Sequence, residues 1–280
     1  MGFFYALKNN GSIGIFDSGY GGLTILDKIR SRLPQYNYMY LGDNARTPYG
    51  TRSYEVVYQY TLEAVKYLFD QGCPLVILAC NTASAKALRT IQQNDLISMA
   101  PNNRVLGVLR PTTEEIGRIT KTNHIGILGT SGTVNSQSYA IEITKFFPNV
   151  VVTQQSCPMW VPLIENNEFE NPGGKYFIKK YIDEILAQDS KIDTIVLACT
   201  HYPIIEEKIK EILPSSIRLL SQGDLVAEKL EDYLLRHTSI NNRLIKAGNI
   251  EFLTTENKLS FDAIASKFSK NSVASKTVAL

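Results

Sequence analysis

The chain has few cysteines, and their arrangement excludes a disulfide framework. Its 280 residues include four of them, Cys73, Cys80, Cys157 and Cys199, without a dense cluster or a CxxC pair. Such sparse thiols are typical of a reducing compartment and predict free cysteines. Histidine is equally scarce, with three in the sequence. No further Cys/His pair has a suitable spacing to complete a zinc site with Cys199 and His201, so we expect no bound metal.

Long apolar runs and an excess of one charge are also missing. No stretch approaches the roughly 20 apolar residues that a membrane-spanning helix needs. The net charge is +2 with both signs well mixed, which predicts neither a nucleic-acid partner nor a membrane surface. The first residues, MGFFYALKNN, lack the charged start, apolar core and cleavage site of a signal peptide. Apolar residues make up 44% of the chain, as in ordinary globular proteins, so we expect a soluble cytoplasmic protein.

What the sequence does contain is a regular alternation of strand-like and helix-like segments. Short apolar runs rich in β-branched residues are typical of buried strands, and the stretches between them have helical period. Apolar stripes predict helices over 54–71, where Gly72 supplies a C-terminal stop, and over 175–188. The alternation predicts an α/β fold with parallel sheets covered by helices. The expected strands are 12–17, 37–42, 74–80, 104–109, 123–128, 149–154, 193–199, 216–221 and 249–254.

Two pairs of segments indicate an internal repeat. SIGIFDSGYGG at 12–22 resembles HIGILGTSGTV at 124–134, and PLVILACNTAS around Cys80 resembles DTIVLACTHYP around Cys199. The two pairs are offset by 112 and 119 residues, measured from Gly14 and from Cys80. Such similar offsets predict two related α/β domains with insertions between the anchors.

The repeat also predicts the domain organisation. The second unit begins near residue 108 and ends near residue 219, which leaves the C-terminal helix and strand without a unit of their own. We expect this C-terminal part to return and complete the first domain. The predicted boundaries are 1–107 with 220–268 for the first domain, 108–219 for the second, and a loose tail at 269–280.

Cys80 and Cys199 are the first candidates for chemistry. Each ends a predicted buried strand, at the edge where open α/β sheets bind their ligands. Each also precedes a polar turn that opens a helix, and a helix N-terminus lowers a thiol pKa from about 8.5 towards neutrality. Two thiols presented in this way suggest a two-base mechanism, with one thiol on each face of a substrate carbon. Cys73 and Cys157, each followed by proline, are better interpreted as small buried apolar residues.

Three further segments place polar groups near these cysteines. His201 lies two residues after Cys199 and is suited to tuning or reprotonating the thiol. Asp17 and Ser18 end the first predicted strand before a glycine-rich turn, whose backbone amides can approach an anionic group. This turn lacks a GxGxxG pattern and a second acidic residue, so we interpret it as a carboxylate or ammonium site instead of a dinucleotide site. TPYG at 47–50 is by itself only a turn.

Six sequence motifs occur here in a fixed order: FDSGxGGL, GDxARxPYG, ACNTA, IGxxGT, CPxxVPLxE and ACTHYP. Together they resemble the glutamate racemases, a cofactor-independent family that supplies D-glutamate for peptidoglycan, and the resemblance extends over the whole chain. It implies two flavodoxin-like domains that clamp one amino acid between them. It also implies that the enzyme uses no cofactor, works in the cytoplasm and forms a homodimer.

The same resemblance implies roles for individual residues. The two catalytic cysteines match Cys80 and Cys199, and their acidic and histidine helpers match Asp17, Glu165 and His201. One thiolate removes the α-proton of glutamate and the other thiol donates a proton from the opposite face. By analogy with the family, Cys80 acts on D-glutamate and Cys199 on L-glutamate. The substrate-binding positions match Asp17, Ser18, Tyr49, Gly50, Asn81, Thr82, Thr200 and His201.

Two positions depart from the family pattern. Arg110 and the Pro-Thr-Thr that follows it stand where an acidic residue and Pro-Gly are usual. Ser221 stands where aspartate is usual. Both lie near the predicted crossing between the domains, so they concern the hinge and the oligomeric arrangement instead of the chemistry.

Three alternatives stay open from the sequence. A relative that acts on aspartate or on a hydantoin would share the two thiols, and the grip on the distal carboxylate decides between these substrates. A Cys–His hydrolase or transferase would use Cys199 as a nucleophile and tolerate the loss of Cys80. A periplasmic-type amino-acid binding protein also has two α/β domains, but the missing export signal and the two strand-end cysteines count against it.

Overall fold

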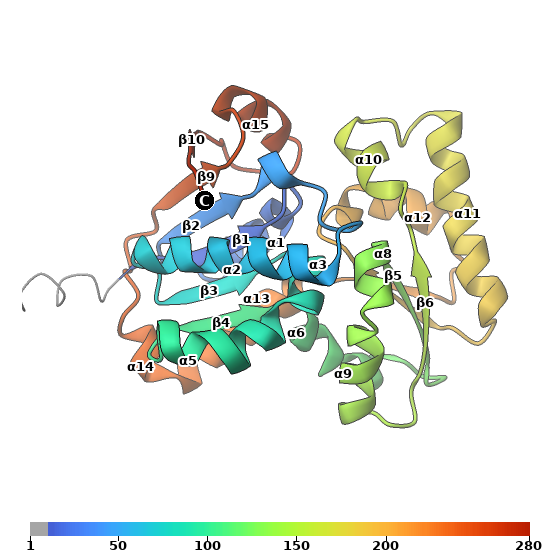
Figure 1. The fold of residues 1–280 in the computed structure, drawn as a ribbon. Helices are drawn as coiled ribbons and strands as arrows, with labels where there is room; N and C mark the ends of the chain where they lie inside the picture. The colour runs from blue at the N-terminus through green and yellow to red at the C-terminus, as the bar shows by residue number, and fades with distance from the viewer. Residues whose placement is uncertain (1–10) are drawn as a thin grey trace, which may run out of the picture.

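The structure, a computed structural model, describes residues 11–280. The signal-peptide prediction and the first ten residues of the first predicted domain lie outside the described residues. Two parallel sheets form two lobes that lie side by side (Figure 1). The strands are β1 (Ile13–Asp17), β2 (Tyr38–Gly42), β3 (Leu75–Leu78), β4 (Arg104–Gly107), β5 (His124–Gly129), β6 (Val151–Ser156), β7 (Thr194–Ala198), β8 (Arg218–Ser221), β9 (Ile250–Thr254) and β10 (Ser275–Thr277).

The two sheets share one strand order. The first sheet runs β10-β9-β2-β1-β3-β4 and the second runs β6-β5-β7-β8, and all their ladders in the described part of the chain are parallel. The segment β2-β1-β3-β4 therefore corresponds strand by strand to β6-β5-β7-β8. This is the flavodoxin-like order, which binds ligands at the carboxyl ends of its strands. The predicted α/β class, the two parallel sheets and the nine expected strands are confirmed.

Local sequence explains where the two long helices begin and end. The Ser53 side chain caps α2 by accepting a hydrogen bond from a backbone N–H, and Gly72 follows the helix with a φ of 89° that costs glycine little. Asn171 caps α11, with Pro172 in its first turn. Both predicted helices are confirmed. The helices are α1 (Gly22–Arg32), α2 (Tyr54–Asp70), α3 (Asn81–Lys86), α4 (Leu88–Thr90), α5 (Leu96–Met99), α6 (Leu109–Thr113), α7 (Ile116–Ile119), α8 (Ser131–Asn135), α9 (Ser138–Phe146), α10 (Trp160–Glu165), α11 (Pro172–Gln188), α12 (Glu206–Ile212), α13 (Gly223–Arg236), α14 (Thr238–Asn241) and α15 (Lys258–Ala265).

Burial follows the position of each strand in its sheet. The central strands β1, β3 and β7 are buried along their whole length, as expected for parallel strands covered on both faces. The edge strands β6 and β8 are partly exposed. No helix within residues 11–280 has both the length and the apolar character needed to cross a bilayer. The central strands are therefore held by buried apolar clusters, one of which continues from the first lobe into the second.

The chain leaves the first sheet after β4 and returns after β8, where α13 packs against α1. The two residues that depart from the family pattern lie at these crossings. Arg110 in α6 pairs with Glu114 at 2.9 Å, and the Ser221 hydroxyl at the end of β8 donates to Glu206 at 2.5 Å. Both residues that differ from the family pattern therefore have an ion-pair or hydrogen-bond partner nearby in this chain. β8 also extends two residues past the predicted boundary at residue 219, and the other predicted boundaries stay predictions.

The prediction that 269–280 is a loose tail is wrong. Residues Ser275–Thr277 form β10, which pairs in parallel with β9 and extends the first sheet. The segment before it is tied to α1, because the Asp27 carboxylate accepts hydrogen bonds from the Ser269 hydroxyl (3.0 Å) and the Lys270 backbone N–H (2.7 Å). A polar three-residue strand has almost no apolar pattern, and it forms here because β9 offers an otherwise unpaired edge.

Asp193 ties the start of β7 to the segment that precedes β5. Its carboxylate accepts hydrogen bonds from the Thr120 hydroxyl at 2.7 Å and from the backbone N–H groups of Lys121 and Thr122 at 2.6 and 2.7 Å. Burial acts to raise the pKa of Asp193, but these hydrogen bonds outweigh it and lower the pKa from 3.8 to about 2. The resulting stabilisation is complete above pH 3.8 and is lost as the pH falls through about 2.

We expect Asp193→Asn to lower the free energy of unfolding by about 1–2 kcal/mol at neutral pH, because the amide binds these donors less strongly than a carboxylate. The difference from wild type should shrink as the pH falls from about 4 to about 2, where the wild-type carboxyl becomes protonated. Urea unfolding across this range measures the effect, with the exposed Asp232→Asn in α13 as the control. A difference that stays constant down to about pH 2 would contradict the assignment.

Candidate active site

A cavity of about 240 Å³ lies between the two lobes, at the carboxyl ends of both sheets. Its volume is below the roughly 300–1,000 Å³ that drug-sized ligands occupy, so it suits a small molecule. Residues from both lobes line it, and they include all the predicted site residues except Asp17. These residues are Ser18, Tyr49, Gly50, Cys80, Asn81, Thr82, Glu165, Cys199, Thr200 and His201.

Cys80 lies just after β3 and caps α3. Its Sγ is 3.4 Å from the Ser18 hydroxyl oxygen and accepts a hydrogen bond from the Ala83 N–H at 3.5 Å. Burial and, after it, the nearby Asp17 raise the pKa of Cys80 to about 12, although both hydrogen bonds oppose the shift. The predicted lowering of this thiol pKa is therefore wrong. The hydrogen bond from the start of the short helix α3 does not compensate for the removal of the sulfur from water. Cys80 is therefore a neutral thiol at physiological pH.

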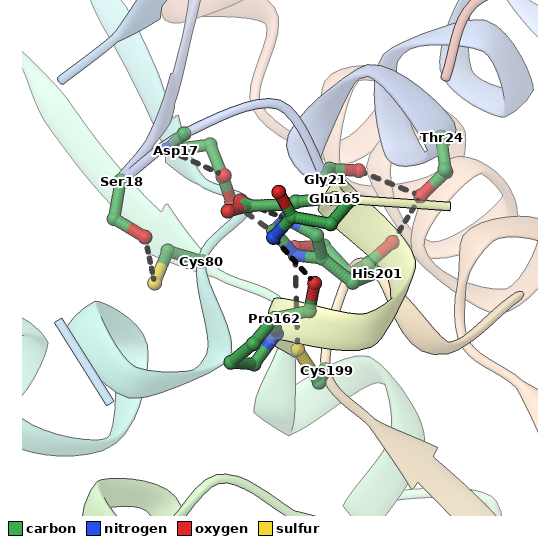
Figure 2. A network of polar contacts seen from close by, with 12 residues as sticks. Asp17, Ser18, Gly21, Thr24, Cys80, Pro162, Glu165, Cys199 and His201 are labelled. Carbon is green, nitrogen blue, oxygen red and sulfur yellow. Dashed lines mark hydrogen bonds and ion pairs between the residues drawn. The ribbon is translucent and has the colours of Figure 1, made fainter. Parts of the chain in front are cut away.

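Cys199 lies at the other side of the cavity, directly after β7. Its Sγ is 3.9 Å from Nδ1 of His201, whose Nε2 is 2.9 Å from Oε1 of Glu165 (Figure 2). Burial alone lowers the pKa of His201, but the contacts with Cys199 and Glu165 outweigh it and raise this pKa to about 10. His201 is therefore an imidazolium at neutral pH. An imidazolium beside a sulfur stabilises a thiolate and can also supply its proton.

Asp17 is completely buried and lies behind the cavity wall. Its Oδ2 accepts a hydrogen bond from the Gly19 N–H at 3.0 Å, and its Oδ1 accepts one from the Thr200 hydroxyl at 3.3 Å. Burial raises the pKa of Asp17 more than the positive charge of His201 lowers it. The glycine-rich turn predicted to approach an anion thus approaches the carboxylate of Asp17 itself.

Gly21 leaves the space in which the His201 ring lies. A Cβ atom on this residue would be 2.3 Å from the Thr200 hydroxyl oxygen and 2.4 Å from Nδ1 of His201. Nearby, the Thr24 hydroxyl donates to the Thr200 carbonyl at 3.0 Å. The glycines after β1 therefore allow the turn that carries Cys199 to pack directly against the first lobe.

Hydrogen bonds between the lobes also close the cavity near α3 and α8. The Gly132 N–H donates to the Gly50 carbonyl at 2.7 Å, and the hydroxyl oxygens of Thr82 and Thr130 are 2.9 Å apart. A Cβ atom on Gly50 would lie 2.9 Å from Cβ of Thr130. The glycine in the TPYG turn is therefore required for this close approach.

The cavity also has lining residues that were not among the predicted site residues, and three of them are Thr130, Ser131 and Cys157. Thr130 caps α8 and Ser131 begins it. The internal repeat contains the signal for them, because its offset of 112 residues aligns Thr130 with Ser18. Cys157 is buried, as predicted, but it also lines the cavity. Among residues 11–280, no group of three or more His, Cys, Asp or Glu side chains is arranged to hold a metal ion.

Comparison with known proteins agrees with this geometry. The family model for Asp/Glu/hydantoin racemases matches residues 23–230. A glutamate racemase from Geobacter metallireducens is 36% identical over 262 residues, which cover 92% of each chain. The crystal structure of a glutamate racemase from Bacillus anthracis matches with a TM-score of 0.87 at 31% identity, covering 96% of this chain and 98% of that chain. The structure of a Francisella tularensis glutamate racemase in complex with D-glutamate has a TM-score of 0.85 at 31% identity, covering 97% and 98%.

The family model spans well over half of the chain, and the relative from Geobacter metallireducens is similar over nearly the whole length. The two solved structures share the arrangement of two parallel sheets at nearly full coverage. These findings place the chain in a racemase family, so it is neither a periplasmic-type binding protein nor a Cys–His hydrolase. The chain belongs to the Asp/Glu/hydantoin racemase family and is an isomerase.

Proposed function

We propose that this chain interconverts L- and D-glutamate by proton transfer between the α-carbon and two cysteines. One observation carries the proposal: Cys80 and Cys199 follow equivalent strands of the two sheets, β3 and β7, and line the same small cavity. A substrate carbon held between them has a sulfur available on each face. The similarity to glutamate racemases from other organisms supports this substrate.

Two bases are needed because one base tends to return the proton to the face that it left. In the direction from L-glutamate, the Cys199 thiolate removes the α-proton and the Cys80 thiol protonates the opposite face. The surroundings of the two sulfurs suit these roles. Cys80 is held as a thiol by burial beside Asp17, and Cys199 lies next to the His201 imidazolium. In the direction from D-glutamate the two cysteines exchange roles.

The intermediate is a carbanion with high energy, so the cavity must stabilise negative charge near the α-carbon. Hydrogen-bond donors that are already oriented supply this stabilisation without reorganising during the reaction. Asn81, Thr82 and Thr200 are polar and buried, and they line the cavity where the two carboxylates of glutamate would bind. The hydrogen bond between Gly132 and Gly50 helps to exclude water while the two thiols hold defined protonation states.

Aspartate and hydantoins are the competing substrates within the family. The proposal is tested by following the circular dichroism of L-glutamate, D-glutamate, L-aspartate and a hydantoin with the purified protein and no added cofactor. We expect the optical activity of both glutamate enantiomers to decay to zero, with far slower decay for the other compounds. Faster racemisation of aspartate or of the hydantoin would identify that compound as the substrate in place of glutamate. Inactivity towards all four compounds would refute the proposal.

We further propose that the protein works as a cytoplasmic homodimer and supplies D-glutamate for peptidoglycan. This extension rests on the family resemblance of the six motifs and not on a contact in the structure. Sedimentation of the purified protein tests the dimer. Depletion of the protein in its host should stop growth, and added D-glutamate should restore it if the supply role is correct.

Replacement of either catalytic cysteine should abolish full racemisation. We expect Cys80→Ser and Cys199→Ser each to lower kcat/KM for glutamate by about 10³-fold or more. The serine hydroxyl is a far weaker acid than the thiol, so it neither ionises to form a base near neutral pH nor readily donates a proton. Each variant should keep one-sided chemistry, seen as elimination of HCl from one enantiomer of a chloro-substituted glutamate.

The matched control for these variants is Cys73→Ser, which changes a buried cysteine outside the cavity. Its activity per folded molecule should stay close to wild type. Racemisation at the wild-type rate by Cys80→Ser or by Cys199→Ser would disprove the two-base assignment. Loss of activity in the Cys199 variant alone would favour a single nucleophilic cysteine.

The pH dependence of the reaction should report the charge on His201. The pKa of about 10 predicts that kcat/KM falls above that pH, as the imidazolium beside Cys199 loses its proton. L- and D-glutamate have equal free energies, so kcat/KM has the same pH profile in both directions and either enantiomer can be used.

Glu165→Gln removes the negative charge that helps to raise the pKa of His201. We therefore expect the alkaline fall in kcat/KM to move to lower pH by about one unit or more. Glu207→Gln, which changes an exposed carboxylate in α12, is the control and should leave the profile in place. An alkaline limb at the same pH in wild type and in Glu165→Gln would contradict the role of this ion pair.

A further inference from the structure

Asn81 has a side-chain amide that is only half satisfied by the protein. The residue is 2% exposed and lines the cavity, and its Oδ1 accepts a hydrogen bond from the Tyr139 hydroxyl at 2.6 Å. Its Nδ2, in contrast, is buried without a hydrogen-bond partner. A buried N–H group without a partner is costly, so proteins rarely keep one unless a ligand uses it. The unpaired donor therefore indicates a contact with the substrate.

The orientation of this amide follows from a chain of hydrogen bonds that begins at a backbone carbonyl. Nε2 of Gln222 is 3.2 Å from the Val108 carbonyl oxygen, which can only accept, so this end of Gln222 carries the protons. The same nitrogen is 2.6 Å from the Tyr139 oxygen, so Tyr139 accepts there. The hydroxyl proton of Tyr139 must then point to Oδ1 of Asn81. Nδ2 is left to face the cavity.

These residues connect the active site to both crossings between the lobes. Val108 follows β4, where the chain leaves the first sheet, and Gln222 follows β8, where the chain returns. Gln222 is also 2.9 Å from the Thr112 hydroxyl in α6. Tyr139 belongs to α9 in the second lobe, whereas Asn81 begins α3 in the first. Tyr139 is completely buried and Gln222 nearly so, so water does not compete for the hydrogen bonds between these side chains.

We propose that Tyr139 and Gln222 are positioning residues that hold the Asn81 amide with Nδ2 towards the cavity, as a donor to a substrate carboxylate. The two ends of an amide have almost the same shape, so packing alone does not choose between them. A rotated amide would present Oδ1 to the carboxylate and repel it. This inference rests on the proposed function, because it assigns the carboxylate to an acidic amino acid.

The direct test removes the hydroxyl of Tyr139 without changing the ring. We expect Tyr139→Phe to raise the Kd for D-glutamate, measured by calorimetry, by about tenfold, as for the loss of one hydrogen bond to a charged group. KM should rise by a similar factor while kcat changes less, because the contact with the carboxylate is present both before and during proton transfer. Gln222→Met should act in the same direction, since it removes the donor that orients Tyr139.

A double-mutant cycle separates this role from a merely structural one. In an Asn81→Ala background the amide is absent, so Tyr139→Phe should then leave the Kd unchanged. The control is Tyr38→Phe, which removes another buried hydroxyl whose hydrogen bond to the Leu33 carbonyl is 2.7 Å long, away from the cavity. Its Kd and KM should match wild type. Thermal melting confirms that each variant is folded before binding is measured.

The outcomes distinguish this inference from the proposed function. If wild type racemises glutamate but Tyr139→Phe and Gln222→Met bind D-glutamate as tightly as wild type does, the positioning role is refuted and the proposed function stands. Additive effects of Tyr139→Phe and Asn81→Ala would refute it as well, because independent losses show no coupling. If wild type neither binds nor racemises glutamate, the proposed function fails and the inference fails with it.

Discussion

The active site depends on one constraint: the carboxyl ends of two parallel sheets face the same cavity. In the first sheet β3 pairs with β1, and in the second sheet β7 pairs with β5. A cysteine follows β3 and another follows β7. Strand ends held by a closed core place Cys80 and Cys199 far more firmly than long loops would. The lobes then have to approach closely, which explains why Gly21 and Gly50 stand where any side chain would collide with the opposite lobe.

The two halves repeat the topology but not the electrostatics. Next to Cys80, burial first and the nearby Asp17 second raise the pKa of the thiol, so the sulfur keeps its proton. Next to Cys199 lies the His201 imidazolium, whose Nε2 pairs with Glu165. A duplicated fold thus supplies two equivalent positions for sulfur, and the neighbouring residues give these positions different electrostatic surroundings. This difference suits the proposed mechanism, in which one cysteine acts as the acid and the other as the base at the same carbon.

The sequence allowed us to predict the strands and both long helices, because buried parallel strands and amphipathic helices leave strong apolar patterns. It also allowed us to predict that Cys80 and Cys199 occupy equivalent strand ends, because the segments around them resemble each other. Other features depend on contacts distant in sequence and leave no such pattern. The high pKa of Cys80 results from burial beside Asp17, which outweighs the capping effect of a short helix. Likewise, β10 forms because the edge of β9 is available for pairing. The orientation of the Asn81 amide depends on Tyr139 in the second lobe and on Gln222, which follows β8.

The measurement that tests the two-base account most directly is the racemisation of L-glutamate in deuterated water, stopped early and analysed for deuterium in each enantiomer. The account predicts deuterium at the α-carbon of the D-glutamate product, because the Cys80 thiol exchanges its proton with solvent before it donates. The L-glutamate that is recovered should keep its original proton, since Cys199 returns only the proton it took. Rapid deuterium incorporation into the recovered L-glutamate, or a product that retains the substrate proton, would contradict the account and indicate one base.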